Sequence, residues 1–164
     1  MKKGKTFKIG IVLLIAVFGF FIVRALSPTP RTPRDAFERL IVKPMPSSVS
    51  SLKVGGFLGM NDAFQIFCLQ IGKPDLQLIV DSRHFVPVDE QNEFEAWDTT
   101  LDRHRQVQKS EYLRGWEQKI KDVVKLDWHL TDSCQIYLLK EKNCETRLFA
   151  ETNSSAAVFV FEMH

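Results

Sequence analysis

The chain has 164 residues, with 22 lysines and arginines against 20 aspartates and glutamates, for a formal net charge of +2. This length suits one domain with a single core, and a second domain is not expected. Residues 1–24 hold five of the basic residues and none of the acidic ones, so residues 25–164 carry a net charge of −3. Because the outer part has no basic surplus, we expect no nucleic-acid partner.

An apolar run of 15 residues, 9–23, follows four lysines within residues 1–8. The run is shorter than the roughly 20 residues of a typical span, but flanking Lys8 and Arg24 can extend their charges to the headgroups. Residues 9–26 are therefore predicted to be an uncleaved transmembrane signal-anchor. The lysines favour a cytoplasmic N-terminus. We expect a single-pass protein of the bacterial inner membrane with its C-terminal domain periplasmic or extracellular; secretion after signal cleavage is the alternative.

Residues 27–46 read as a proline-rich stalk followed by a short helix, and residues 47–164 as the extracytoplasmic domain. Thr32 is placed to cap the helix, with Pro33 at its first position. Its apolar residues recur at helical spacing: Phe37, Leu40 and Ile41. The pattern predicts a helix packed on the domain, with a membrane-surface or partner-binding helix as the alternative.

The next elements are predicted to be strands. Residues 48–54 have the content of a modest strand, Gly55-Gly56 indicates a turn, and residues 57–60 would begin the return strand. Residues 63–71 are apolar on both faces, which is typical of a central strand. Gly72 and Pro74 end that strand and open a helix with an apolar face made of Leu76, Ile79 and Val80.

This part of the chain resembles a group of small proteins. The resemblance lies in Pro46-x-Ser48-Val49-x-x-Leu52, Phe57 with Asp62, the apolar residues 64–69, and Pro74-Asp75-Leu76 running to Phe85. In this order they are similar to small bacterial signal-anchored envelope proteins of unknown function. The resemblance covers about 40 residues and implies an N-terminal anchor with one small α+β domain. Its motifs are structural, so it implies no active-site residue.

Residues 86–108 are polar and irregular, and long loops of this kind often carry function. We expect the binding surface here, on Phe94, Trp97, Arg103, His104 and Arg105. The arginines, with Arg114 nearby, could hold an anionic group through guanidinium forks. The alternatives are a lid that covers the sheet with its two aromatic residues, and a solvated face for the basic residues.

A helix with the apolar stripe Leu113, Trp116, Ile120 and Val123 follows, with Glu117 and Lys121 spaced for an i, i+4 ion pair. Residues 135–139, 146–150 and 156–161 then read as three strands of a meander. The prediction is an α+β fold: an antiparallel sheet of about five strands with two or three helices packed on one face, preceded by a transmembrane helix.

One stretch holds groups that could carry chemistry: Asp127, His129, Asp132 and Cys134. Neither metal-ligand spacing nor a nucleophile signature accompanies them. We therefore predict no metal and no cofactor; whether the protein is an enzyme stays open, and a non-enzymatic role is favoured. The alternative is a small extracytoplasmic enzyme that uses this group, with His129, Cys134 and Asp127 as the catalytic candidates, or that uses the carboxylates Asp89, Glu90, Glu93 and Glu95.

Three further features are the cysteines, the histidine at position 84 and a sequence motif for glycosylation. An oxidising compartment permits a disulfide, for which Cys134 and Cys144 are the best pair, whereas Cys68 is expected to be a small buried hydrophobe. His84 is expected to be a satisfied histidine at a helix edge. Asn153-Ser154-Ser155 matches the N-glycosylation sequon, which matters only in a eukaryotic secretory pathway.

The sequence as a whole favours a membrane-anchored envelope protein. It would contact the membrane through residues 9–26 and present a non-enzymatic binding or assembly module. The expected partner is an envelope protein, and the oligomeric state stays open.

Overall fold

A computed structural model describes residues 32–59, 62–88 and 109–164 in full, and the backbone of 95–98 and 103–106. Residues 31–164 form one compact unit. The predicted membrane segment, 9–26, lies outside the described residues. Among the residues that are described, no helix is long and apolar enough to cross a membrane.

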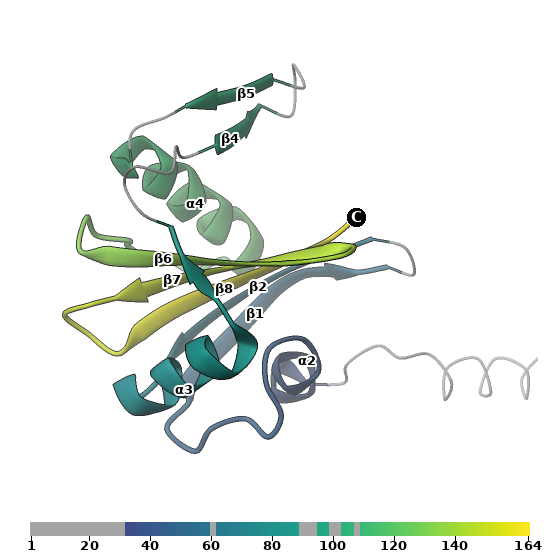
Figure 1. The fold of residues 1–164 in the computed structure, drawn as a ribbon, viewed down its shortest axis with the longest axis vertical. Helices are drawn as coiled ribbons and strands as arrows, with labels where there is room; N and C mark the ends of the chain where they lie inside the picture. The colour runs from purple at the N-terminus through teal and green to yellow at the C-terminus, as the bar shows by residue number, and fades with distance from the viewer. Residues whose placement is uncertain (1–31, 60–61, 89–94, 99–102, 107–108) are drawn as a thin grey trace, which may run out of the picture. The chain divides into compact units, whose positions relative to one another are not determined.

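The unit is built on an antiparallel sheet of six strands, one more than predicted (Figure 1). The strands lie in the order β1-β2-β8-β7-β6-β3, and every neighbouring pair is antiparallel. Their bounds are β1 Ser50–Leu58, β2 Ala63–Gln70, β3 Val86–Pro87, β6 Cys134–Glu141, β7 Cys144–Glu151 and β8 Ala156–Met163. The predicted C-terminal meander is confirmed. Its last strand, β8, lies in the middle of the sheet, between β2 and β7.

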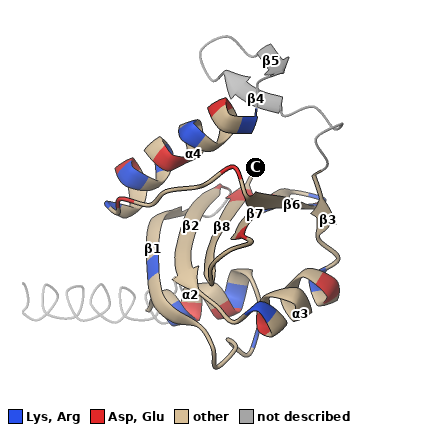
Figure 2. Cartoon of the chain, turned by 90° about the vertical axis from the view of Figure 1, so that its left-hand side faces the viewer, with Lys and Arg blue, Asp and Glu red and all other residues tan. Residues whose placement is uncertain are grey.

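Helices cover both faces of this sheet, so the prediction that they pack on one face is wrong (Figures 1 and 2). Helices α2, Pro33–Leu40, and α3, Lys73–Arg83, lie on one face, and α4, Lys109–Val124, lies on the other. The physical reason is that β2 and β8 are apolar on both faces. If one of these faces stayed exposed to water, each of its phenylalanine or isoleucine side chains would lose about 2 kcal/mol of stabilisation.

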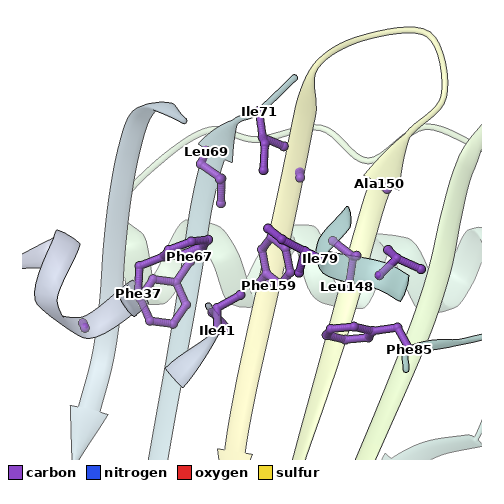
Figure 3. Close-up of a cluster of buried hydrophobic side chains, with 13 residues drawn as sticks. Phe37, Ile41, Phe67, Leu69, Ile71, Ile79, Phe85, Leu148, Ala150 and Phe159 are labelled. Carbon is purple, nitrogen blue, oxygen red and sulfur yellow. The ribbon is translucent and has the colours of Figure 1, made fainter. Parts of the chain in front are cut away.

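The core beneath α2 and α3 is aromatic (Figure 3). The ring of Phe37, on α2, meets the rings of Phe67 and Phe159 edge-on, each at a centroid distance of 5.7 Å. The hydroxyl of Thr32 accepts a hydrogen bond from the Asp35 amide at 3.1 Å, as expected of an N-cap. The helix predicted after the proline-rich stretch therefore packs on the domain.

The core beneath α4 contains the predicted stripe. Leu113, Trp116 and Ile120 are buried against the sheet, and Val123 is partly buried. The ion pair predicted between Glu117 and Lys121 is absent from this described helix, because each side chain reaches the segment that follows α4.

That segment, 125–131, is held to α4 by these same two residues. Lys121 Nζ pairs with Asp127 at 3.2 Å, and Glu117 Oε1 accepts a hydrogen bond from the Leu130 amide at 2.7 Å. Local i, i+4 spacing thus failed to predict the partners because a longer-range contact was available to both side chains.

The turn predicted at Gly55-Gly56 is also wrong, since β1 runs through both glycines. A Cβ atom at Gly55 would lie 2.5 Å from the Val123 carbonyl oxygen, so the end of α4 approaches the strand closely here. Gly56 has φ +113°, and a Cβ atom there would lie 2.0 Å from the Phe64 oxygen. Both positions therefore need glycine for packing and backbone conformation rather than for a chain reversal.

The disulfide considered between Cys134 and Cys144 is not formed. All three cysteines are free. Cys134 pairs with Glu151 at one end of the β6–β7 hairpin, and Cys144 pairs with Glu141 at the other. Seven residues of extended strand separate these positions by about 23 Å, whereas a disulfide requires Cα atoms within about 7 Å.

Candidate functional site

The residues considered as the alternative catalytic group do not assemble into a site. The His129 side chain is 79% exposed and lies 3.7 Å from Glu117 Oε1, while Asp127 pairs with Lys121. Cys134 is buried, its thiol donates a hydrogen bond to the Gln135 carbonyl at 3.5 Å, and burial raises its pKa to about 12. A buried thiol with this pKa is protonated at neutral pH, so it makes no Cys-His nucleophilic pair with the exposed imidazole.

The remaining predicted groups are also dispersed. Asp132 is exposed and offers its backbone carbonyl to Lys109 Nζ at 2.9 Å. His84 is exposed and ends α3 in a left-handed conformation with φ 58°. Arg114 lies exposed on α4. Within the described ranges, no three His, Cys, Asp or Glu side chains gather as metal ligands. The carboxylates Asp89, Glu90 and Glu93 lie outside the described residues, and only the backbone of Glu95 is described.

The structure brings together four of the five predicted binding residues. Strands β4, Glu95–Asp98, and β5, Arg103–Gln106, form a two-stranded antiparallel ribbon separate from the six-stranded sheet. In this ribbon Trp97 pairs with His104, Ala96 with Arg105, and Asp98 with Arg103. The fifth residue, Phe94, lies outside the described residues.

This ribbon, β4–β5, is the candidate binding site. Paired positions on antiparallel strands have Cβ atoms about 5 Å apart. The register therefore places positions 97 and 104 on one face of the ribbon and positions 103 and 105 on the other, because successive positions of a strand alternate between its faces. Tryptophan and arginine are the residue types that contribute most at protein interfaces, and arginine matches a carboxylate or phosphate with two parallel hydrogen bonds.

The structure also contains a cluster of charged side chains that was not predicted from the sequence. Arg147, on β7, makes ion pairs with Glu145 on the same strand and with Glu162 on β8. The three side chains are 12%, 19% and 19% exposed, in that order. Glu145 and Glu162 are direct partners in the β7–β8 register, so Arg147 neutralises two carboxylates that face each other across the strands.

Aromatic and cationic groups of α4 border this Glu145–Arg147–Glu162 cluster. The Arg147 guanidinium lies 5.4 Å from the centroid of the Trp116 ring, and Lys119 Nζ lies 4.3 Å from it. Burial lowers the pKa of Lys119 and raises the pKa of Tyr112. The signal in the sequence was the alternation along β7, which places Glu145 and Arg147 on the same face as the buried Phe149.

Comparisons with protein-family models, with curated proteins and with solved structures found no match in any of the three.

Proposed function

We propose that this protein is a single-pass, membrane-anchored envelope protein whose outer domain is a non-enzymatic binding or assembly module. The observation that carries the proposal is the register of the β4–β5 ribbon, which pairs Trp97 with His104 and Asp98 with Arg103. The proposed partner is an envelope protein that presents an acidic segment to this ribbon.

The chemistry of the ribbon supports an acidic partner. Arg103, His104 and Arg105 are consecutive on β5, and Asp98 and Glu95 are the only acidic residues on the four-residue strand opposite. The remainder of the chain beyond residue 24 is net negative. The two arginines of β5 balance the two carboxylates of β4, so the ribbon is neutral on a domain that is otherwise net negative. Its strand β5 would therefore attract an acidic partner better than the rest of the surface does.

The N-terminal segment supports the anchored topology. Four lysines precede the apolar run, and this arrangement favours an N-terminus in the cytoplasm. Residues 27–32 separate the predicted membrane segment from α2, and six residues span at most about 20 Å when fully extended. An uncleaved anchor would therefore hold the domain close to the bilayer, where its partner would also be membrane-bound or wall-bound.

Site-specific photocrosslinking tests this proposal. A photoreactive amino acid replaces Trp97 in the full chain, expressed at native level in intact cells. The matched control places the same amino acid at Leu78, which is 64% exposed on α3. We expect an adduct of one discrete mass from position 97 and none from position 78.

Two further outcomes decide the interpretation. Combining Arg103→Ala and Arg105→Ala with the probe at position 97 should abolish the adduct, because the basic groups provide the attraction. Equal adducts from positions 97 and 78, or no adduct from either, would refute the ribbon as the contact surface. Carbonate extraction of the membranes, which removes peripheral proteins, tests the anchor separately.

A further inference from the structure

The turn between β7 and β8 carries the only Asn-x-Ser/Thr sequence of the chain. The turn consists of the four residues 152–155, and Asn153, Ser154 and Ser155 are all exposed. Figure 1 shows this turn projecting from the end of the sheet that lies away from the C-terminus. The sequon therefore lies on a surface that an enzyme can reach in the folded domain.

We propose that Asn153 is an acceptor for an N-linked glycan, and that the co-substrate is a lipid-linked oligosaccharide. In the transfer, the Asn153 side-chain nitrogen attacks the anomeric carbon of the first sugar. A nitrogen–carbon bond forms, the bond from that carbon to the lipid diphosphate breaks, and the amide loses one proton to the transferase. The proposal rests on the extracytoplasmic placement proposed above. It widens the sequence-based expectation, which restricted the sequon to a eukaryotic secretory pathway, to any membrane that carries such a donor on its extracytoplasmic side.

The neighbouring contacts fix the ends of the turn. Thr152 Oγ1 donates a hydrogen bond to the Ser133 carbonyl at 3.0 Å, and Lys73 Nζ donates to the Thr152 carbonyl at 2.7 Å. On the other side, the Ile71 amide donates to the Ser155 carbonyl at 2.8 Å. Two of these contacts use backbone carbonyls of the turn as acceptors and one uses the Thr152 hydroxyl as a donor, so the turn is held in place without the Asn153 amide.

The side chains that define the sequon, Asn153 and Ser155, differ from Ser154 in their hydrogen bonding. The Ser154 hydroxyl accepts a hydrogen bond from the Ala156 amide at 3.1 Å. Within the described residues, no hydrogen bond reaches the Asn153 side-chain amide or the Ser155 hydroxyl. The nucleophile and the hydroxyl two residues later are thus both available, while the residue between them stabilises the turn.

A defined reaction tests the proposal on the intact protein. The full chain, folded in detergent, is mixed with a purified single-subunit N-oligosaccharyltransferase and a lipid-linked oligosaccharide, and intact mass is measured. We expect a gain of one glycan mass, mapped to Asn153 by peptide sequencing. Asn153→Gln and Ser155→Ala should each abolish the gain, whereas Ser154→Ala and Ser155→Thr should retain it.

Two results would overturn the proposal. One is no transfer to the folded full chain, while a synthetic peptide of residues 148–158 is glycosylated in the same mixture. The other is a mass gain that persists in Asn153→Gln. The reaction in detergent requires neither a membrane orientation nor a protein partner, so its failure is distinguishable from failure of the crosslinking experiment above.

Discussion

Replacing Arg147 with methionine removes the only guanidinium that contacts both Glu145 and Glu162 among the described side chains. Methionine keeps most of the apolar stem but leaves two carboxylates paired across β7 and β8. In the described part of the chain, the one ion-pair partner then left to them is the exposed Lys140, whose Nζ lies 3.9 Å from Glu145. Each carboxylate side chain is only 19% exposed, so water relieves the repulsion poorly. Breaking a buried ion pair by removal of one partner costs about 3 kcal/mol or more.

Urea unfolding of the full chain in detergent at pH 7, followed by far-UV circular dichroism, measures the free energy of unfolding of the wild type and of each variant. The triple variant with Arg147→Met, Glu145→Gln and Glu162→Gln should regain most of the lost stability, since it removes both carboxylate charges as well. The control Arg34→Met breaks an exposed i, i+4 pair with Glu38 and should cost far less than Arg147→Met. A loss below about 1 kcal/mol at position 147, or a triple variant that is no more stable than Arg147→Met, would refute the reasoning.

Two further predictions concern packing and thiols. Gly55→Ala should lower the free energy of unfolding by about 1–3 kcal/mol, because the added Cβ atom overlaps the Val123 carbonyl. The control Gly115→Ala adds a Cβ atom in open space on α4 and should raise the free energy of unfolding by about 0.5–1 kcal/mol. Thermal unfolding of both variants measures these changes, and equal shifts in melting temperature would contradict the prediction. Burial raises the pKa of Cys68 and of Cys134 from 9.0 to about 12. The two buried, protonated thiols should therefore stabilise the fold fully below pH 9, and this stabilisation should fall as the pH rises towards 12. Alkylation by iodoacetamide at pH 8 should accordingly be slow at both thiols until urea unfolds the chain, and rapid labelling of the folded protein would exclude this.

The two most apolar strands, β2 and β8, were predictable because their signal is local. Residues 63–70 and 156–163 are apolar at nearly every position, and this pattern identifies strands buried on both faces. The N-terminal cap at Thr32 was equally local, since one hydroxyl and one amide three residues later define it. Such features need only neighbours in sequence, and the structure has them as predicted.

The layering and the polar cluster depend on contacts between distant residues. The apolar stripe of α4 shows which side of the helix is buried but not which face of the sheet it covers. Gly55-Gly56 gives the same local signal for a turn as for a strand that a helix approaches closely, and only the position of Val123 distinguishes the two. Arg147 and Glu162 lie on different strands, so their pairing required the β7–β8 register.

The position of β8 determines when the domain can fold. Its two neighbours, β2 and β7, do not pair with each other, so the β1–β2 hairpin has no hydrogen-bonded link to β6 and β7 until residues 156–163 have been synthesised. The β2–β8 pairing joins residues about 90 positions apart, and such long-range contacts form slowly. A chain emerging from the ribosome would thus remain without its complete sheet until that last strand arrives. Under the membrane topology proposed above, this delay would keep the polypeptide unfolded while it passes through a membrane channel.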